Sequence, residues 1–350
     1  MAETLAQRYT GVICDLDGVV RRGSVAVPHA VEELSALTSS VVYATNNASL
    51  TPDDVAGQLL GLGLAARPDQ VVTSSQAGAA YAATLFPPGA PVLAVGGPGV
   101  ASALLEVGLA PVATAEEGVV AVLQGYGPEV TALDLAEASY AIEQGATWVA
   151  TNRDATLPTH RGIAPGNGAL LGAVAIATGR QPNASAGKPE APLYDLSVTR
   201  LRVPKSDVLA IGDRLDTDIL GAMAAGLDSL WVLTGVDDLL TLATAPGRPA
   251  PTYAARDLRA LAHPPVVPRQ EGQDWVCDSV RLSVAWEHGH ALVRCSGRDD
   301  ADALVALATA ALVHGRDVVG APAGVLVRLA TTVAEHLVRL AAEPGGVPAQ

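Results

Sequence analysis

The stretch GVICDLDGVV at residues 11–20 decides the fold that we expect of this chain. Its apolar first half predicts a short buried strand at residues 12–14, followed directly by a turn that carries Asp15 and Asp17. Side chains two residues apart in an extended segment point to the same side, so the spacing predicts that both carboxylates face one small volume. Gly18 then lets the chain turn sharply, because it has no Cβ.

Two carboxylates that face one small volume repel each other unless a cation lies between them or one is protonated. Oxygen ligands without sulfur or imidazole favour a hard cation such as Mg²⁺. The alternative is an ordinary acidic turn, since Asp-x-Asp is common by itself. The position at the carboxyl end of a buried strand favours a functional site, because ligands of open α/β sheets bind there.

The composition limits the class of protein. The chain has 350 residues, enough for two or three domains, and 49% of them are hydrophobic. A net charge of −14 argues against a nucleic-acid or anionic-membrane partner, and 3% aromatic residues leave no platform for stacking bases. We see no signal peptide and no apolar run long enough to span a bilayer. With three cysteines that form no disulfide framework, we expect a cytoplasmic location.

Lysine is rare in this chain and therefore informative. Of the 22 basic residues only Lys188 and Lys205 are lysines. Where a chain prefers arginine so strongly, a retained lysine indicates a need for its compact point charge. Lys188 lies in a stretch of small residues, 183–187, where backbone and ammonium can both approach an anion. The alternative is a surface lysine.

Other polar groups follow predicted strands. The strand at residues 41–44 leads into Thr45 and Asn46, which can donate hydrogen bonds to phosphoryl oxygens or, alternatively, form a turn and helix cap. The strand at 148–150 leads into a polar loop at 151–158, a candidate to face the substrate or simply a solvated turn. The residues of that loop that we single out are Asn152, Arg153 and Asp154.

A third strand, at residues 208–211, leads into an acidic loop. Asp213 is a candidate metal ligand there, while Asp216 or Asp218 can cap the helix that follows. Beyond the proline-rich residues 263–268 the pattern changes to a hairpin around residues 288–290 and two helices, at 300–313 and 324–341. His288 and His290 hint at a metal, but without a third ligand nearby we interpret them as a polar hairpin turn.

Four motifs stand together in one order: DLDGVV at 15–20, ATNNAS at 44–49, GKPE at 187–190 and GDRLDTDI at 212–219. In this order they resemble the haloacid dehalogenase (HAD) superfamily of phosphohydrolases, over about residues 8–262. The large insertion between the second and third motifs resembles the class IIA, C2-capped subclass. With a C-terminal extension, the chain most resembles bacterial glycerol-3-phosphate phosphatases.

The resemblance implies an α/β fold class: a Rossmann-like HAD core with a parallel sheet, an inserted α/β C2-type cap and a small C-terminal α+β domain. The implied core comprises residues 1–80 and 183–262, and the implied cap comprises residues 81–182. A proline-rich linker at 263–268 then leads to the α+β domain at 269–350. This last domain faintly resembles part of an acetyltransferase fold but lacks the glycine-rich turn that binds the coenzyme pyrophosphate, so we do not expect acyl transfer.

Residue roles follow from the resemblance. Asp15 would be the nucleophile that forms an aspartyl-phosphate, and Asp17 the general acid and base. Mg²⁺ would be held by the carboxylates of Asp15 and Asp213 and by the backbone carbonyl of Asp17, with Asp218 supporting them. The second aspartate of DLD separates phosphatases from dehalogenases in this superfamily, which disfavours dehalogenation.

The substrate would be a small phosphomonoester. Thr45, Asn46 and Lys188 would bind the phosphoryl group, and the cap loop would touch the leaving group. The cap residues implied are Asn152, Arg153 and Asp154. Glycerol 3-phosphate fits the polar loop best, with 2-phosphoglycolate, pyridoxal 5′-phosphate or a nucleotide monophosphate as alternatives. A metabolite-sensing regulator built on a phosphatase core is the alternative of another class, and homo-oligomerisation stays open.

Overall fold

The structure is a computed structural model of the 350-residue chain and describes residues 2–116, 118–159, 161–244, 247, 249–277, 280–287, 290–296 and 300–342. Its mixed α/β architecture with parallel sheets confirms the predicted fold class. The chain forms two compact units. Unit 1 comprises Met1–Arg22, Ala26–Ser39 and Ser206–Gln350, and unit 2 comprises Gly23–Val25 and Ser40–Lys205. The predicted boundaries between core, cap, linker and C-terminal domain stay predictions. Within the described residues, no helix combines the length and the apolar character needed to cross a membrane.

Parallel strands organise the first half of unit 1. Strands β1 (Gly11–Asp15) and β13 (Val208–Gly212) are buried along their whole length, as strands of a parallel sheet covered on both faces are. They pair in parallel from Gly11↔Val208 to Cys14↔Ile211, so their carboxyl ends meet at one edge. The sheet continues through β14 (Asp228–Val232) to β15 (Tyr253–Ala255), again in parallel.

Short elements complete this part of the unit. They are β2 (Arg21–Arg22), β3 (Val25–Ala26), α1 (Ala30–Ser35), α8 (Leu220–Ala225) and α9 (Leu239–Thr244), together with the short helical turns Ala6–Arg8, Lys205–Asp207, Leu215–Ile219 and Leu258–Ala262.

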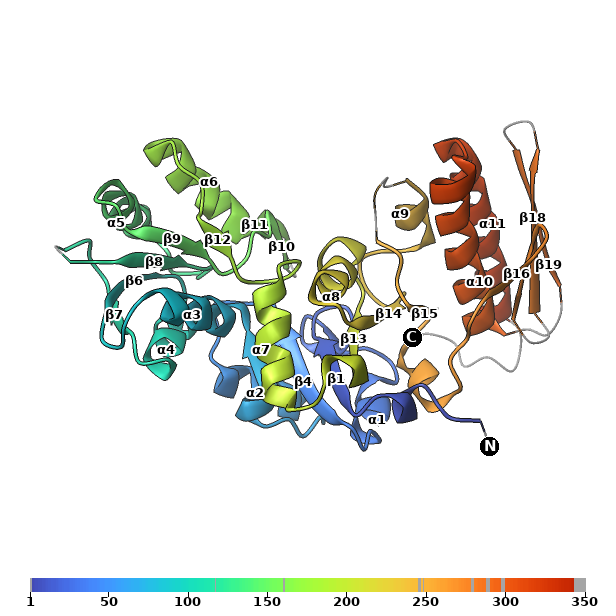
Figure 1. Cartoon of the computed structure of the whole chain (residues 1–350), viewed down its shortest axis with the longest axis horizontal. Helices are drawn as coiled ribbons and strands as arrows, with labels where there is room; N and C mark the ends of the chain where they lie inside the picture. The colour runs from blue at the N-terminus through green and yellow to red at the C-terminus, as the bar shows by residue number, and fades with distance from the viewer. Residues whose placement is uncertain are drawn as a thin grey trace. The chain divides into compact units, whose positions relative to one another are not determined.

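The C-terminal part of unit 1 is a four-stranded antiparallel sheet with two helices lying against it (Figure 1). Pairing of β18 (Val280–Glu287) with β19 (His290–Ser296) runs from Arg281↔Ser296 to Glu287↔His290, which confirms the predicted hairpin; His288 and Gly289 lie outside the described residues. Helices α10 (Ala301–His314) and α11 (Ala323–Ala342) confirm the two predicted helices. The remaining elements are β16 (Arg269–Glu271), β17 (Asp274–Cys277) and the turn Gly315–Val319.

One hydrophobic cluster joins the C-terminal helices to the parallel sheet of the same unit. On the sheet side, the cluster contains side chains of β14 and of the segments that follow β13 and β14. On the C-terminal side, it contains buried side chains of α10, α11 and β18. Its sheet-side members include Leu215, Ile219, Trp231, Leu239 and Leu242, and its C-terminal members include Leu282, Leu304, Leu307, Leu326, Leu329 and Val333. The C-terminal helices α10 and α11 are therefore packed into the same apolar core as the segment that carries Asp213 and Asp218.

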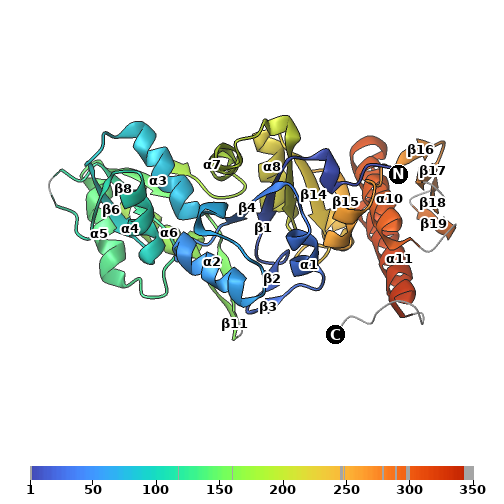
Figure 2. The same ribbon diagram turned by 90° about the horizontal axis from the view of Figure 1, so that it is seen from below.

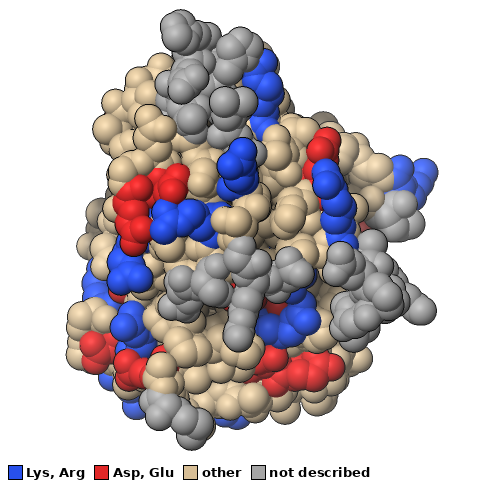
Figure 3. Space-filling model, turned by 90° about the vertical axis from the view of Figure 1, so that its right-hand side faces the viewer, with Lys and Arg blue, Asp and Glu red and all other residues tan. Residues whose placement is uncertain are grey.

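A polar contact accompanies this packing. The backbone N–H of Arg256, just after β15, donates to Asp302 Oδ1 at 3.0 Å near the start of α10. Burial raises the pKa of Asp302. On the face shown in Figure 3, basic and acidic side chains lie beside one another rather than gathering by sign. Within the antiparallel sheet, Arg281 contacts Asp274 at 2.6 Å and Glu271 at 2.9 Å.

Unit 2 contains a five-stranded sheet in the order β12-β9-β8-β6-β7, with α3 and α4 on one face and α5 and α6 on the other (Figure 1 and Figure 2). The strands of this sheet are β6 (Pro91–Val95), β7 (Ala110–Val112), β8 (Ala121–Gln124), β9 (Thr147–Ala150) and β12 (Ala184–Ser185). The helices are α3 (Ser74–Leu85), α4 (Pro98–Glu106), α5 (Ala132–Glu143) and α6 (Asn167–Thr178). The unit also contains β4 (Ser40–Thr45), β5 (Val71–Thr73), α2 (Pro52–Gly61), α7 (Ala191–Leu201) and the turn Pro68–Gln70.

The sequence patterns missed several elements of unit 2, namely the strands β5, β7 and β12, helix α3 and the hairpin at residues 156–165. Helix α3 escaped notice because its Ala- and Ser-rich sequence has little periodicity, although Thr73 and Gln76 form a capping box that marks its start. The predicted loop at 151–158 is wrong beyond Ala155, since β10 (Thr156–Thr159) pairs with β11 (Gly162–Pro165). Neither strand alternates apolar and polar residues, so the sequence carried no strand signal there.

We predict that Leu329→Ala lowers the free energy of unfolding by about 2–5 kcal/mol, because it opens a cavity in the shared cluster. Leu329 is fully buried, whereas Val338 on the same helix is 69% exposed and offers a matched control. Urea denaturation measures both variants. Equal effects of Leu329→Ala and Val338→Ala would contradict the shared core.

Candidate active site

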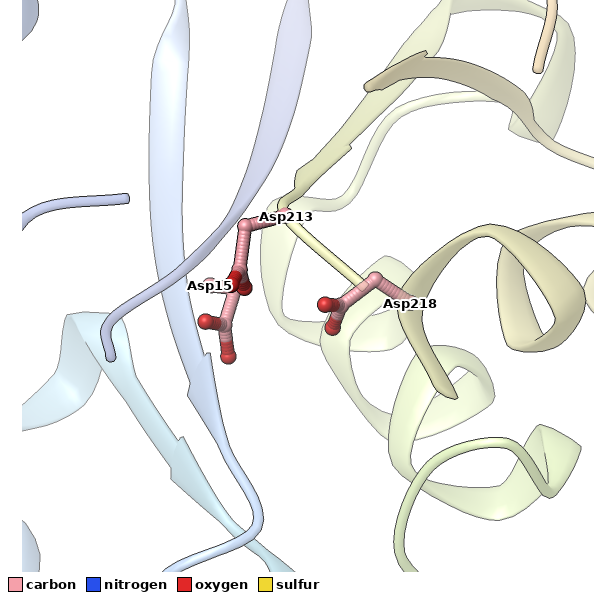
Figure 4. A group of neighbouring side chains, drawn as sticks. All are labelled: Asp15, Asp213 and Asp218. Carbon is pink, nitrogen blue, oxygen red and sulfur yellow. The ribbon is translucent and has the colours of Figure 1, made fainter. Parts of the chain in front are cut away.

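Three aspartates of unit 1 meet at the carboxyl ends of β1 and β13. Asp15 ends β1, Asp213 follows β13, and Asp218 lies in the π-helical turn Leu215–Ile219. One carboxylate oxygen of each lies within 4.8 Å of the other two, and all three residues are buried. Figure 4 shows the three side chains directed toward one another. The prediction that Asp15 and Asp213 come together is therefore consistent with the structure.

Two hydrogen bonds hold Asp213 in this position. The N–H of Val236 donates to Asp213 Oδ2 at 2.6 Å, and Trp231 Nε1 donates to the Asp213 carbonyl oxygen at 3.0 Å. Gly18 and Gly235 approach the carboxylate so closely that a Cβ on either would overlap it. The two glycines thus leave room for the carboxylate where any other residue would displace it.

Asp218 is held by the acidic loop itself. Its Oδ2 accepts a hydrogen bond from the backbone N–H of Arg214 at 3.1 Å, and a Cβ on Gly212 would collide with it. Asp216 instead pairs with Arg214 at 3.2 Å. Helix α8 starts without a side-chain cap, so neither aspartate does the capping that the sequence left open. Whether Asp218 binds a metal or only supports the site stays a prediction.

Asp17 is not one of the three clustered carboxylates, and that its carboxylate faces the same volume as Asp15 stays a prediction. Extended geometry ends at Asp15, and the chain then turns through Gly18 at φ 100°. The i, i+2 rule for strands therefore does not reach Asp17. Its side chain is 59% exposed and pairs with the buried Arg21 guanidinium, Nε to Oδ1, at 3.1 Å.

The donor set of the acidic cluster fits a hard divalent cation. It offers carboxylate oxygens, with neither sulfur nor imidazole in the group, and oxygen ligands are those that Mg²⁺ prefers. Buried carboxylates this close together repel strongly unless a positive charge offsets them. Asp15, Asp213 and Asp218 are the residues placed to hold such an ion.

A second polar cluster, in unit 2, is centred on Asn46 and Lys188. Asn46 Oδ1 accepts from the Lys188 N–H at 2.8 Å, and Asn46 Nδ2 donates to the Lys188 carbonyl at 3.0 Å. Lys188 is buried, and its Nζ donates to the carbonyl of Ala44 at 3.2 Å. The surface alternative for Lys188 is wrong.

The loop that follows β9 is tied into the same cluster. Asn152 Nδ2 donates to the Asn46 carbonyl at 2.7 Å, and Asn46 Nδ2 also donates to Asp154 Oδ2 at 3.2 Å. Arg153 is exposed and donates to the Pro182 carbonyl at 3.5 Å. Asn152 and Asp154 thus support Asn46, while Arg153 lies at the surface. Thr45 is buried, and its hydroxyl accepts from the Asn47 N–H at 3.0 Å, as in the turn that the sequence offered as an alternative.

Sequence reasoning missed the residues that position the carboxylates. Val236 acts through its backbone N–H and Trp231 through its indole, and neither residue type indicates a metal site. Arg21 could have been found from its spacing four residues after Asp17. Gly235 gave a weaker signal for the site than Arg21, because a single glycine after a strand is common.

Sequence comparison assigns the chain to a family. Residues 12–110 match the family model described as haloacid dehalogenase-like hydrolase, and residues 185–261 match a second model described as HAD-hydrolase-like. The D-glycerol 3-phosphate phosphatase of Mycobacterium tuberculosis is 45% identical over 259 residues, which cover 74% of this chain and 72% of that protein. The chain belongs to the haloacid dehalogenase-like hydrolases.

Further relatives of this HAD-type hydrolase are also phosphatases. The acid sugar phosphatase of Staphylococcus aureus (strain USA300) is 36% identical over 255 residues, covering 72% of this chain and 96% of that protein. A crystal structure of glycerol phosphate phosphatase from M. tuberculosis in complex with magnesium has a TM-score of 0.80 at 40% identity, covering 89% of this chain and 92% of that one. The p-nitrophenyl phosphatase of Archaeoglobus fulgidus has a TM-score of 0.66 at 28% identity, covering 72% and 97%. The chain is an enzyme of the phosphatase branch of the superfamily.

We predict that Lys188→Arg lowers kcat by about 10²-fold or more, because a larger guanidinium does not fit the buried ammonium site. Lys205→Arg is the matched control, since Lys205 is half exposed and pairs with Asp195 at the surface at 2.7 Å. Phosphate release measures activity, and circular dichroism checks folding. Similar activity in both variants would exclude Lys188 from the site.

A second prediction concerns Asn46. Asn46→Asp replaces the amide donor to Lys188 and Asp154 by a carboxylate and sets two carboxylates side by side. We expect a loss of about 1–3 kcal/mol in the free energy of unfolding, because buried partners are left unsatisfied. Urea denaturation at neutral pH measures it, and Asp154→Asn in the same background should restore part of the loss. Unchanged stability in Asn46→Asp would contradict the network.

Proposed function

We propose that this phosphatase is a Mg²⁺-dependent phosphomonoester hydrolase that works through an aspartyl-phosphate and acts on glycerol 3-phosphate. The observation that carries the proposal is the cluster of Asp15, Asp213 and Asp218 at the carboxyl ends of two buried parallel strands. This edge of a parallel sheet is where α/β enzymes bind ligands. The donor set supports a divalent cation, and Asp15 supplies a carboxylate as nucleophile.

The chemistry proceeds in two displacements. A carboxylate oxygen of Asp15 attacks phosphorus, the bond to the ester oxygen breaks, and Asp17 gives its proton to the leaving alkoxide. Asp17 then accepts a proton from water as the water attacks phosphorus, and the bond to Asp15 breaks to release inorganic phosphate. Bound Mg²⁺ would offset the negative charge that the nucleophile and the dianionic ester share.

The surroundings of Asp17 support its role as acid and base. Its carboxylate is accessible, so it can exchange protons with a leaving group and with water. The Arg21 guanidinium is 9% exposed and holds the carboxylate on one side. Backbone bonds from Gly18 N to the Arg21 carbonyl at 2.8 Å and from Arg21 N to the Leu16 carbonyl at 2.9 Å fix the turn between them.

The phosphoryl group would be recognised by Thr45, Asn46 and Lys188. We assign Lys188 to charge compensation, and Thr45 and Asn46 to the phosphoryl oxygens. The network around Asn46 supports this assignment, because it fixes the backbone on both sides of Lys188. Asn152, Arg153 and Asp154 remain the candidates for contacts with the leaving group, with Arg153 the one whose side chain is exposed.

Glycerol 3-phosphate is favoured as the substrate by the M. tuberculosis relatives named for glycerol phosphates. The aromatic residues in the cap also bear on the choice. Trp148 is buried in the sheet and donates to Gln124 Oε1 at 3.1 Å, which removes it from any ligand-stacking role. Tyr126 and Tyr140 are left for stacking a pyridoxal or nucleobase ring. The polar cap loop suits a small polyol better.

The proposal is tested by phosphate release from a panel of phosphomonoesters with Mg²⁺ and with a chelator. The panel includes both glycerol phosphates, 2-phosphoglycolate, pyridoxal 5′-phosphate and nucleotide monophosphates. We expect metal-dependent turnover that is highest on glycerol 3-phosphate, and a loss of about 10⁴-fold in Asp15→Asn, because the nucleophile is removed. Asp53→Asn, at an exposed position of α2, is the matched control.

Three outcomes would change the account. Turnover highest on another ester would keep the mechanism and replace the substrate. Full activity in Asp15→Asn would contradict the covalent mechanism. No turnover on any ester with Mg²⁺ present would favour the regulator over the enzyme.

A further inference from the structure

Asp237 is a buried carboxylate in unit 1 that the chemistry above does not use. It lies in the segment Thr234–Asp238 between β14 and α9, two residues after Gly235. Its Oδ2 accepts a hydrogen bond from the backbone N–H of Leu215 at 2.7 Å. Leu215 is the first residue of the π-helical turn that ends at Ile219 and contains Asp218.

The same segment makes two further contacts, one with Asp213 of the acidic cluster and one with the turn that follows β1. The Val236 N–H donates to Asp213 Oδ2 at 2.6 Å, and the Thr234 hydroxyl donates to the Gly18 carbonyl at 2.7 Å. Contacts from Thr234, Val236 and Asp237 therefore bind this segment to the turns that carry Asp17 and Asp213. Of these three residues, Asp237 is the one that binds the turn after Asp213, and its side chain makes the contact.

The far end of the segment leads into α9, which packs against α10 and α11. Asp238 caps α9 by accepting from the Thr241 N–H at 2.7 Å, and Leu239 and Leu242 of α9 are buried in the shared hydrophobic cluster. Leu215 and Ile219 belong to that cluster as well. Residues at both ends of the Asp237–Leu215 hydrogen bond thus belong or lie next to the same hydrophobic cluster.

We propose that Asp237 is a positioning residue of the acidic site, which fastens the turn carrying Asp213 and Asp218 to a segment seated on the C-terminal helices. The inference rests on the proposed function in taking the cluster to be a cation site. Without the bond from Leu215, the turn can shift at its first residue while Val236 still holds Asp213. The three carboxylates then no longer converge, and the cation is bound less tightly. The C-terminal domain accordingly serves the site by supporting this segment.

The test is the dissociation constant of Mn²⁺, measured by isothermal titration calorimetry on the full chain without substrate. Asp237→Ala removes the acceptor, and we expect the dissociation constant to rise about tenfold or more, as for partners that orient metal ligands. Asp237→Asn keeps an acceptor oxygen and should stay within about threefold of wild type. Asp238→Asn, one residue away, removes the same charge but keeps the cap of α9, and should also stay within about threefold.

Two results would overturn the proposal. One is wild-type Mn²⁺ affinity in Asp237→Ala; the other is equal weakening in Asp237→Asn and Asp237→Ala, which would make charge rather than the hydrogen bond the cause. If Asp237→Ala does not fold, Asp237→Ser replaces it, because its shorter hydroxyl does not reach the Leu215 amide; wild-type affinity there overturns the proposal equally. Absence of Mn²⁺ binding in the wild type would instead overturn the proposed function, and the inference with it.

Discussion

The repulsion among three buried carboxylates is the constraint on which the acidic site depends. Two like charges about 4 Å apart repel by about 4 kcal/mol at an effective dielectric constant near 20, so Asp15, Asp213 and Asp218 converge only where the surrounding structure opposes their separation. That opposition comes from buried parallel strands, from N–H groups directed at the carboxylates, and from glycines that leave room for them. A divalent cation turns the same arrangement from strained to favourable.

The apolar packing of unit 1 serves this constraint. Trp231 links the apolar core to the acidic site, because its ring belongs to the shared cluster and its indole N–H donates to the Asp213 carbonyl. The C-terminal helices α10 and α11 complete that cluster, although none of the three clustered aspartates comes from them.

Much of the fold could be predicted from sequence because its strands are short apolar runs that end in polar turns. Residues 12–14 and 208–211 carried that signal, and the structure brings Asp15 and Asp213 together at the ends of the paired strands. Alternation along β1 does not decide where Asp17 points, because the strand ends at Asp15. Helix α3 and the β10–β11 hairpin were missed where periodicity was weak. Val236, Trp231 and Asp237 act through tertiary contacts, which no local pattern encodes.

The central claim is that the three aspartates form one cation site. It is tested most directly by a crystal structure grown with Mn²⁺, in which anomalous scattering locates the ion. The account predicts one strong peak within bonding distance of carboxylate oxygens of Asp15 and Asp213. A peak elsewhere, or none at this cluster in crystals of protein that needs Mn²⁺ for activity, would contradict it.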